Sequence, residues 1–127
     1  MERNIMVVQS NFIPGSEAEF QEWNANRHLR DVTLITGFSA AQLYQVSPTQ
    51  RAGSPVPRHS HLAIYEITGD PRDALNGLAS TVQQGLMEIS PSLRRDGDVS
   101  AVVFRSLTER VLARDTAAVQ SLKKEHG

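Results

Sequence analysis

The side chains best suited to chemistry in this chain are its histidines. There are four of them, and the sequence contains no cysteine, which excludes disulfides, thiolate nucleophiles and zinc–thiolate sites. His59, His61 and Tyr65 occupy alternate positions of the segment "HSHLAIYEI" at residues 59–67. Alternate side chains of a strand point to one face and lie roughly 7 Å apart. We therefore predict that imidazole and phenol groups meet in one cavity.

This combination favours proton transfer next to a carbonyl group. A neutral imidazole can remove the proton, and a phenol or guanidinium can hold the enolate oxygen that forms. We predict His61 and Tyr65 as catalytic residues. Gln42, Tyr44 and Arg105 are predicted to bind substrate, provided that their strands present the same face to the cavity. The alternatives are a solvated histidine beside a loop and a tyrosine that only packs in the sheet.

A third catalytic candidate, His28, lies in the segment "FQEWNANRHL" at residues 20–29. At about 100° per residue of an α-helix, Trp23 stays close to the line of Phe20, whereas His28 falls on the flank of that line. We expect Trp23 to be core and to touch the substrate. Near a helix C-terminus the backbone dipole favours a protonated imidazole, which suits an acid or an anion anchor. The alternative for His28 is a hydrogen bond to the last helix carbonyls.

The composition argues against several other functions. Lys and Arg total 13 and Asp and Glu total 14, so the net charge of -1 offers no basic surface for nucleic acid. The apolar run at residues 5–8 is too short for a signal peptide or a membrane span, and we expect a cytoplasmic protein without a membrane partner. His59 and His61 could bind a metal, but no carboxylate stands at a fixed spacing beside them. We therefore predict that His59 contacts substrate and that neither a metal nor a cofactor is used.

Periodicity and turn residues predict the elements that position these side chains. A capping box at Ser16 and Glu19 begins the first helix, and Asp70 and Pro71 begin the second. Alternating or apolar runs between turn signals predict strands. In chain order we expect a strand at 4–11, a helix from 16 to about 30, strands at 38–46 and 59–67, a helix from 71 to about 90, a strand at 99–107 and a terminal helix within 108–127.

This order, βαββαβ, predicts an α+β protein with a ferredoxin-like fold. Two helices then cover one face of a four-stranded antiparallel sheet, and the other face is left bare. Both faces of the later strands carry apolar residues, so an uncovered face would be a larger apolar patch than a monomer normally exposes. We predict that two copies pair through their sheets and enclose the cavity between them. The proline-rich residues 47–58 are expected to form a surface loop.

Over about residues 4–107 the chain resembles the dimeric α/β-barrel superfamily, and within it the EthD-like and the small polyketide-cyclase or antibiotic-monooxygenase-like proteins. The resemblance is carried by "PGSEAEFQEWNANRHL" at 14–29, "TGF" at 36–38 and "HLAIYEI" at 61–67. It implies a single ferredoxin-like domain at 1–107, with 108–127 as its helical extension, and a histidine at position 28 facing the mouth of a cavity. Superfamily members include cyclases, isomerases, cofactor-free oxygenases, haem-degrading enzymes and proteins without a known reaction.

Together these observations predict a homodimeric enzyme for a small hydrophobic or aromatic substrate. The expected reaction is cofactor-free acid/base chemistry on an aromatic or polyketide-like carbonyl compound, of the cyclase, isomerase or lyase type. Two alternatives stay open: a cofactor-free monooxygenase of similar substrates, which would consume oxygen, and a non-catalytic dimer that only binds a hydrophobic ligand.

Overall fold

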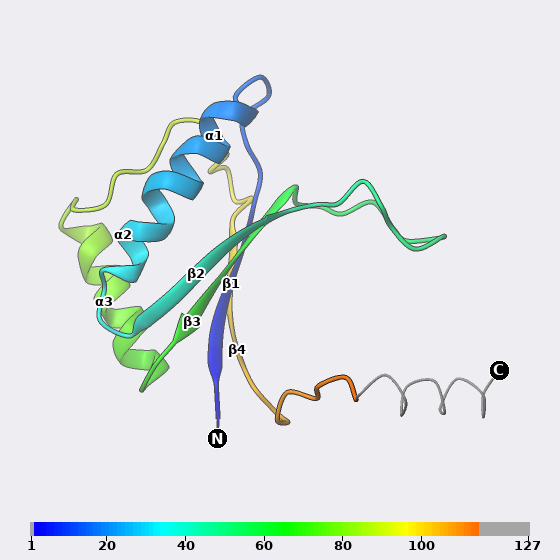
Figure 1. The fold of residues 1–127 in the computed structure, drawn as a ribbon. Coiled ribbons are helices and arrows are strands. Elements are labelled where there is room, and N and C mark those ends of the chain that lie inside the picture. Colours follow the sequence, from blue (N-terminus) through cyan, green and yellow to red (C-terminus); the bar gives the residue numbers. More distant parts are fainter. Residues whose placement is uncertain (1, 115–127) are drawn as a thin grey trace.

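Four antiparallel strands form one sheet, and helices cover only one of its faces (Figure 1). The computed structural model describes residues 2–114. The strands are β1 (Asn4–Ser10), β2 (Phe38–Gln45), β3 (His61–Ile67) and β4 (Ser100–Arg105), in the spatial order β2-β3-β1-β4. Their ends agree with the prediction to within two residues. The predicted α+β, ferredoxin-like fold is therefore confirmed.

The first helical segment is continuous but is not a plain α-helix. It consists of α1 (Glu17–Trp23), the π-helix η1 (Asn24–His28) and α2 (Leu29–Thr33). The segment thus extends about one turn beyond the predicted end near residue 30. The Ser16 side chain makes no capping hydrogen bond, so the predicted capping box does not form.

The second helix, α3 (Pro71–Gln83), begins as predicted and ends early. The Asp70 side chain accepts a hydrogen bond of 2.8 Å from the backbone N–H of Arg72, as an N-cap residue does. The predicted end near Ser90 is wrong. Gly85 adopts a φ of +69° just beyond the helix, which is the left-handed conformation in which glycine terminates helices. The chain that follows has no regular structure until β4.

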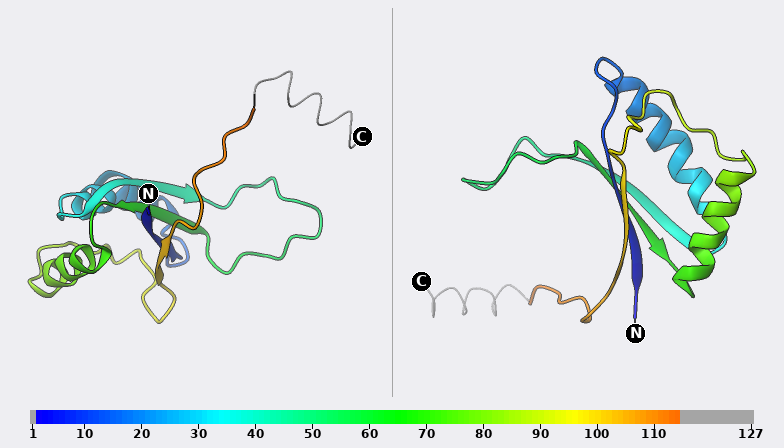
Figure 2. Two further views of the ribbon diagram at one scale, coloured as in Figure 1. Left: turned by 90° about the horizontal axis from the view of Figure 1, so that it is seen from below. Right: turned by 180° about the vertical axis from the view of Figure 1, so that it is seen from behind.

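Two further segments were predicted outside the sheet and its helices. The expected proline-rich loop is confirmed: residues 46–60 project from one end of the sheet as a long arm (Figure 2). The predicted terminal helix is absent from residues 108–114, and its remainder lies outside the described residues. Within residues 2–114, no helix is both long and apolar enough to cross a membrane.

A β-bulge in β2 changes which side chains face the helices. The register with β3 shifts between Phe38 and Ala40, so one residue of β2 is extra. Phe38 is buried under the helices, whereas Gln42 and Tyr44 have the parity of the helix-free face. The prediction that Gln42 and Tyr44 share a face with His61 is therefore wrong, because alternation along a strand does not continue through a bulge.

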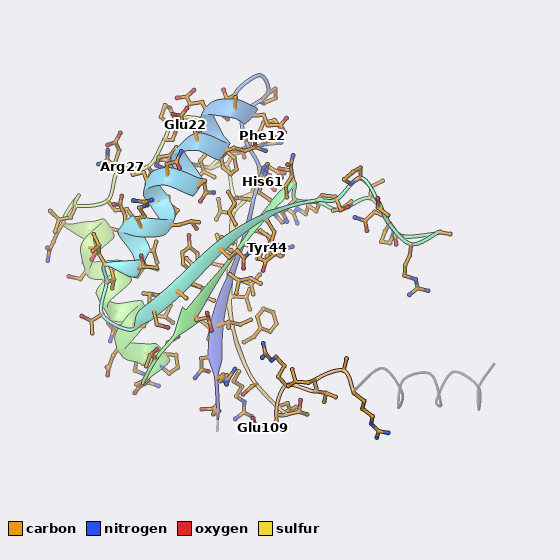
Figure 3. The ribbon with its side chains drawn as sticks, viewed as in Figure 1. Phe12, Glu22, Arg27, Tyr44, His61 and Glu109 are labelled. Atoms are coloured by element: carbon orange, nitrogen blue, oxygen red, sulfur yellow. The ribbon has the colours of Figure 1, made fainter. Side chains whose placement is uncertain are left out.

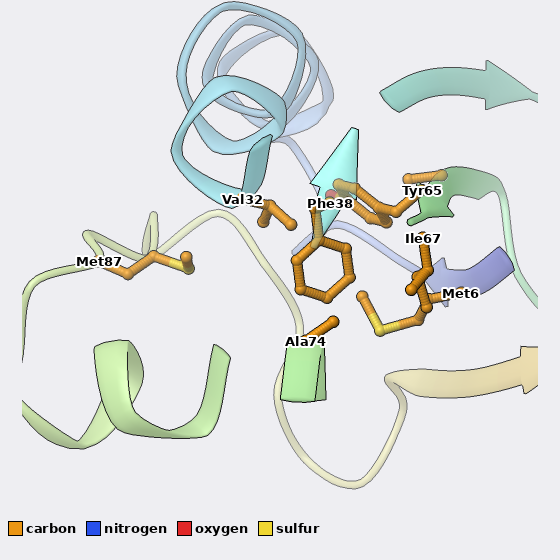
Figure 4. Packing of buried hydrophobic residues seen from close by; sticks show 8 residues of the cluster. Met6, Val32, Phe38, Tyr65, Ile67, Ala74 and Met87 are labelled. Atoms are coloured by element: carbon orange, nitrogen blue, oxygen red, sulfur yellow. The ribbon is translucent and has the colours of Figure 1, made fainter. Parts of the chain in front are cut away.

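The hydrophobic core lies between the sheet and its helices. Figure 4 shows the Phe38 ring at its centre, with Val32 of α2 and Ala74 of α3 on two sides of the ring. The buried cluster consists of Met6, Val32, Phe38, Ala63, Tyr65, Ile67, Ala74 and Met87.

The opposite face of the sheet is apolar and carries no helix. In Figure 3, Tyr44 lies on this side, whereas His61 lies near Phe12 at the side of α1. Tyr44, Val102 and Phe104 are 44%, 45% and 53% exposed. We call this surface the open face and define it by the residues Ile5, Val7, Tyr44, Leu62, Ile64, Val102 and Phe104.

The close packing of β2 against α3 depends on Gly37. Its φ is +104°, and an added Cβ would lie 2.8 Å from the Cβ of Ala74. We expect Gly37→Ala to lower the free energy of unfolding by about 2–5 kcal/mol, since it combines backbone strain with overpacking. Urea unfolding measures this change. Gly53→Ala is the control, because Gly53 has a φ of +81° with nothing within 4 Å of its added Cβ; equal losses in the two variants would show that contact with Ala74 is unimportant.

Candidate active site

An apolar cavity of about 220 Å³ lies between the helix layer and the sheet. Aliphatic and methionine side chains from β1, β3, α2, α3 and residues 84–101 make up most of its wall. The other lining residues are Ser10, Trp23, Asn24, His28 and Tyr65. A single chain forms this cavity, so the cavity does not require the pairing of two copies that we predicted would create it. The helix layer already closes this face of the sheet.

The π-helix directs Asn24 and His28 towards this cavity. In an α-helix, four residues rotate the chain by about 40° more than one full turn. In a π-helix the hydrogen bonds run from i to i+5, so one turn holds more than four residues and four residues rotate the chain by less than one full turn. The two deviations offset each other, so Phe20, Asn24, His28 and Val32 follow one line along the inner side. The backbone N–H of Leu29 donates to the carbonyl of Asn24 and closes the wide turn. The prediction from a uniform α-helix, which put His28 on the flank, did not include this turn.

His28 is held as a neutral imidazole. Burial lowers its pKa below the ordinary value of 6.5, and the carboxylate of Asp31 offsets only part of this effect. The expected stabilisation of the protonated form does not apply, because the helix continues to Thr33 and position 28 is not at its C-terminus. The ring stacks on Trp23 with centroids 4.6 Å apart. Its Nδ1 is buried without a hydrogen-bond partner among the described residues, so the side chain is suited to act as a base.

Tyr65 supplies a neutral hydroxyl to the same cavity. The residue is 1% exposed, and burial raises the pKa of its phenol well above the usual range. No hydrogen bond from residues 2–114 reaches the hydroxyl. The phenol therefore stays protonated at physiological pH and can donate to a ligand.

His61 shares the helix-facing side of the sheet with Tyr65, as predicted, but does not line the cavity. It is 2% exposed and lies under the Phe20 ring, with centroids 4.9 Å apart. The Gln21 amide nitrogen lies 3.0 Å from its Nε2 and the Ser60 hydroxyl 2.7 Å from its Nδ1. An amide nitrogen can only donate, so Nε2 accepts and the proton on Nδ1 is donated to Ser60. Both ring nitrogens are thus used within the protein.

The remaining predicted site residues lie in three places. Trp23 lines the cavity, and its indole nitrogen donates to the carbonyl of Glu88 at 3.2 Å. Tyr44 and His59 line a separate hollow of about 340 Å³, to which His61 also contributes, and the Tyr44 hydroxyl donates to Gln42. Arg105 has helix-facing parity, but at the edge of the sheet its side chain is 72% exposed and lies 3.5 Å from Glu2. The structure therefore brings together Trp23, His28 and Tyr65 in the cavity, and Tyr44, His59 and His61 at the second hollow.

His59 serves to hold the base of the projecting arm. Its Nε2 lies 3.0 Å from the carbonyl oxygen of Asp98. The Asp98 carboxylate in turn accepts a hydrogen bond of 2.6 Å from Asn11, the main reason that the pKa of Asp98 is below its ordinary value. No group of three or more potential ligand side chains within residues 2–114 could hold a metal ion.

One cavity residue, Asn24, was not predicted as part of the site. It is 5% exposed, and its Oδ1 has no hydrogen-bond partner among residues 2–114. The signal was present in the sequence, because Asn24 stands four residues after Phe20 and four before His28. A polar residue on the buried line of a helix breaks the local pattern, and such breaks are expected at functional sites.

The two buried histidines predict a dependence of stability on pH. The pKa of both His28 and His61 lies below 6.5 in the folded protein because of burial. Below pH 6.5 the unfolded chain therefore binds more protons, and the free energy of unfolding should fall as the pH is lowered from about 7 towards 5. Urea unfolding across this range measures the slope. The double variant His28→Gln/His61→Gln should flatten it, and an unchanged slope would contradict the assignment.

Comparison with known proteins supports the fold and leaves the reaction open. No protein-family model and no curated protein sequence matches the chain. An EthD-like protein from Ralstonia eutropha JMP134 superposes with a TM-score of 0.58 at 15% identity, over 87% of this chain and 96% of that one. The haem degrader MhuD from Mycobacterium tuberculosis, solved with two haems in its active site, also gives a TM-score of 0.58, at 14% identity over 85% and 99% of the two chains. A protein from Arabidopsis thaliana gives 0.50 at 14% identity, over 87% and 99%. The resemblance to EthD-like proteins is thereby confirmed at the level of the fold.

Proposed function

We propose that the protein is a small homodimeric enzyme that binds a compact aromatic carbonyl compound and moves a proton next to its carbonyl group. The observation that carries this proposal is the meeting of a neutral imidazole, His28, and a neutral phenol, Tyr65, in one apolar cavity. Apolar surroundings strengthen the interaction of a fixed hydroxyl dipole with a developing oxyanion.

The two side chains have complementary roles. His28 takes a proton from the carbon beside the carbonyl group, so that a C–H bond breaks and an N–H bond forms. The electron pair moves to the carbonyl oxygen, where the Tyr65 hydroxyl donates a hydrogen bond to the enolate. Return of the proton to a different atom of the substrate completes an isomerisation. In a cyclisation, the enolate carbon attacks a second carbonyl of the same molecule, the π electrons of that carbonyl move to its oxygen, and this oxygen takes the proton from His28. Trp23 offers the face of its ring to an aromatic substrate.

The volume of the cavity supports a ligand of one or two rings. Benzene occupies an engineered cavity of about 150 Å³, and pockets for drug-sized ligands begin near 300 Å³. The cavity of about 220 Å³ lies between these sizes. A haem, which MhuD binds in its active site, needs more space than a cavity of about 220 Å³ provides.

The open face supports pairing of two copies. It is an apolar surface across all four strands, and soluble monomers rarely expose such a patch without a partner. Face-to-face packing of two sheets buries such surfaces about 10 Å apart. The cavity of each protomer lies on the other side of its sheet, so each copy has a complete site.

Deuterium exchange tests the proposal without knowledge of the natural substrate. Acetophenone and its hydroxylated derivatives, the three hydroxyacetophenones, lose the NMR signal of their methyl group in D₂O when a base removes a proton beside the carbonyl. We expect the protein to accelerate this loss above the buffer rate. Binding of a probe without faster exchange would favour the non-catalytic alternative, and oxygen uptake at an electrode would favour the monooxygenase.

The exchange rate should depend on pH in one direction only. Because the pKa of His28 lies below 6.5, the neutral base is lost as the pH falls through that value. The rate is therefore expected to rise from pH 5 to a plateau near pH 7. The raised pKa of Tyr65 predicts that the plateau continues to at least pH 10. A midpoint above 7 would contradict His28 as the base.

A further inference from the structure

We infer that the cavity selects an uncharged ligand that carries a hydroxyl or N–H donor in addition to its carbonyl group, and that the side-chain oxygen of Asn24 receives this donor. The inference deepens the proposed function, on which it rests for the role of the carbonyl. It assigns Asn24 as a specificity-determining residue.

The burial of Asn24 supplies the first argument. The residue is 5% exposed, lines the cavity, and leaves its Oδ1 without a partner in residues 2–114. A buried polar atom without a partner destabilises a protein, so one that persists requires an explanation, and a bound ligand that pairs with it is one. Since an amide oxygen can only accept, a ligand satisfies it with an O–H or N–H group.

The charge of the cavity wall supplies the second argument. None of the lining residues is Lys, Arg, Asp or Glu. The residue that precedes His28, Arg27, carries a charge, but its side chain is 56% exposed. Arg27 pairs with Glu88 at 2.9 Å and with Asp31 at 3.6 Å. These ion pairs lie outside the cavity. A carboxylate in the cavity would therefore be desolvated without a counter-ion, which is strongly unfavourable.

The two walls of the cavity set the positions of the ligand groups. Asn24 and His28 project from the π-helix, and Tyr65 projects from β3 in the sheet. A ligand between the walls thus directs its donor to the helix and its carbonyl oxygen to the sheet. Hydroxyaryl ketones have this chemistry, whereas hydroxybenzoates carry a charge and acetophenone lacks the donor.

The single tryptophan of the chain makes binding directly measurable. Trp23 lines the cavity, so its fluorescence reports occupancy in the full-length protein without any turnover. The probes are the three hydroxyacetophenones, acetophenone and the corresponding hydroxybenzoates at pH 7. We expect at least one hydroxyacetophenone to bind at least about tenfold more tightly than acetophenone. Its hydroxybenzoate counterpart should bind at least about 100-fold more weakly than that isomer.

Two variants test whether Asn24 provides the preference. Asn24→Leu keeps the size of the side chain and removes its acceptor, so this variant should bind hydroxyacetophenone and acetophenone equally well. Asn24→Ala should give the same result, and it replaces Asn24→Leu as the test if the leucine disturbs packing. The control is Asn26→Leu, at an exposed position of the same helix, and it should keep the preference. Equal binding of all probes to the unaltered protein, tight binding of hydroxybenzoates, no binding at all, or a preference retained without Asn24 would overturn the inference.

Failure of the inference and failure of the proposed function give different results. Selective binding without faster deuterium exchange would support the ligand class and contradict the proposed catalytic activity. Faster exchange without a preference for the hydroxyl group would support the catalytic activity and contradict the ligand class.

Discussion

Replacement of His28 by glutamine is expected to lower the rate of deuterium exchange by about 10²–10⁴-fold, the usual contribution of a general base. Glutamine retains a polar side chain but cannot take up a proton at neutral pH. Because His28 makes no hydrogen bond through its buried Nδ1, the substitution should have little effect on the thermal midpoint. The measurement is the methyl signal of the best-bound hydroxyacetophenone in D₂O, with circular dichroism as the test of folding.

His61→Gln is the matched comparison, because the sequence also predicted His61 as a catalytic residue. Its imidazole hydrogen-bonds to Gln21 and Ser60 and packs edge-on against Phe20. We expect this variant to keep its exchange rate within a few-fold of the unaltered protein and to lose about 1–3 kcal/mol of unfolding free energy. The opposite result, with exchange lost in His61→Gln and retained in His28→Gln, would return the catalytic role to His61.

Two negative charges on the open face are expected to convert the proposed dimer into a monomer. Val102 and Phe104 point out of β4 and are 45% and 53% exposed in one protomer, so glutamates at these positions should not disturb the core. In the dimer, four carboxylates would become buried without partners, which should weaken association by at least about 10³-fold. Sedimentation velocity of Val102→Glu/Phe104→Glu against the unaltered protein measures the change.

The helix side of the molecule provides the control for this experiment. Leu34 and Leu86 are 84% and 71% exposed, and neither belongs to the open face. The variant Leu34→Glu/Leu86→Glu should therefore sediment as the unaltered protein does. A monomeric unaltered protein, or an unchanged mass of the open-face variant, would contradict the proposed dimer. Since the cavity is complete in each protomer, the monomeric variant should also retain deuterium exchange.

The elements and their order could be predicted because they depend on local signals. Alternating residues and turn residues located all four strands, and Asp70 with Pro71 located the start of α3. The errors occurred where one residue changed the local geometry. Gly85 ended α3 before Leu86 and Ile89, whose spacing alone had suggested a longer helix.

The site was predicted less well, because it depends on two local irregularities. The bulge between Phe38 and Ala40 moved Gln42 and Tyr44 to the open face. The π-helix placed Asn24 and His28 on the inner line of the first helical segment. A bulge and a π-turn each shift the chain by about one residue and leave little trace in composition or periodicity.

The sequence by itself determined the fold class, the strand order along the chain and a small set of polar residues able to transfer protons, since these follow from periodicity and residue type. Only the tertiary structure decided which of those residues meet. It joined Asn24, His28 and Tyr65 in one cavity and enclosed His61 in a separate hydrogen-bond network. The physical reason is that a side chain reaches a cavity through the packing of distant segments on one another, and a shift of one residue is enough to turn it to the other side.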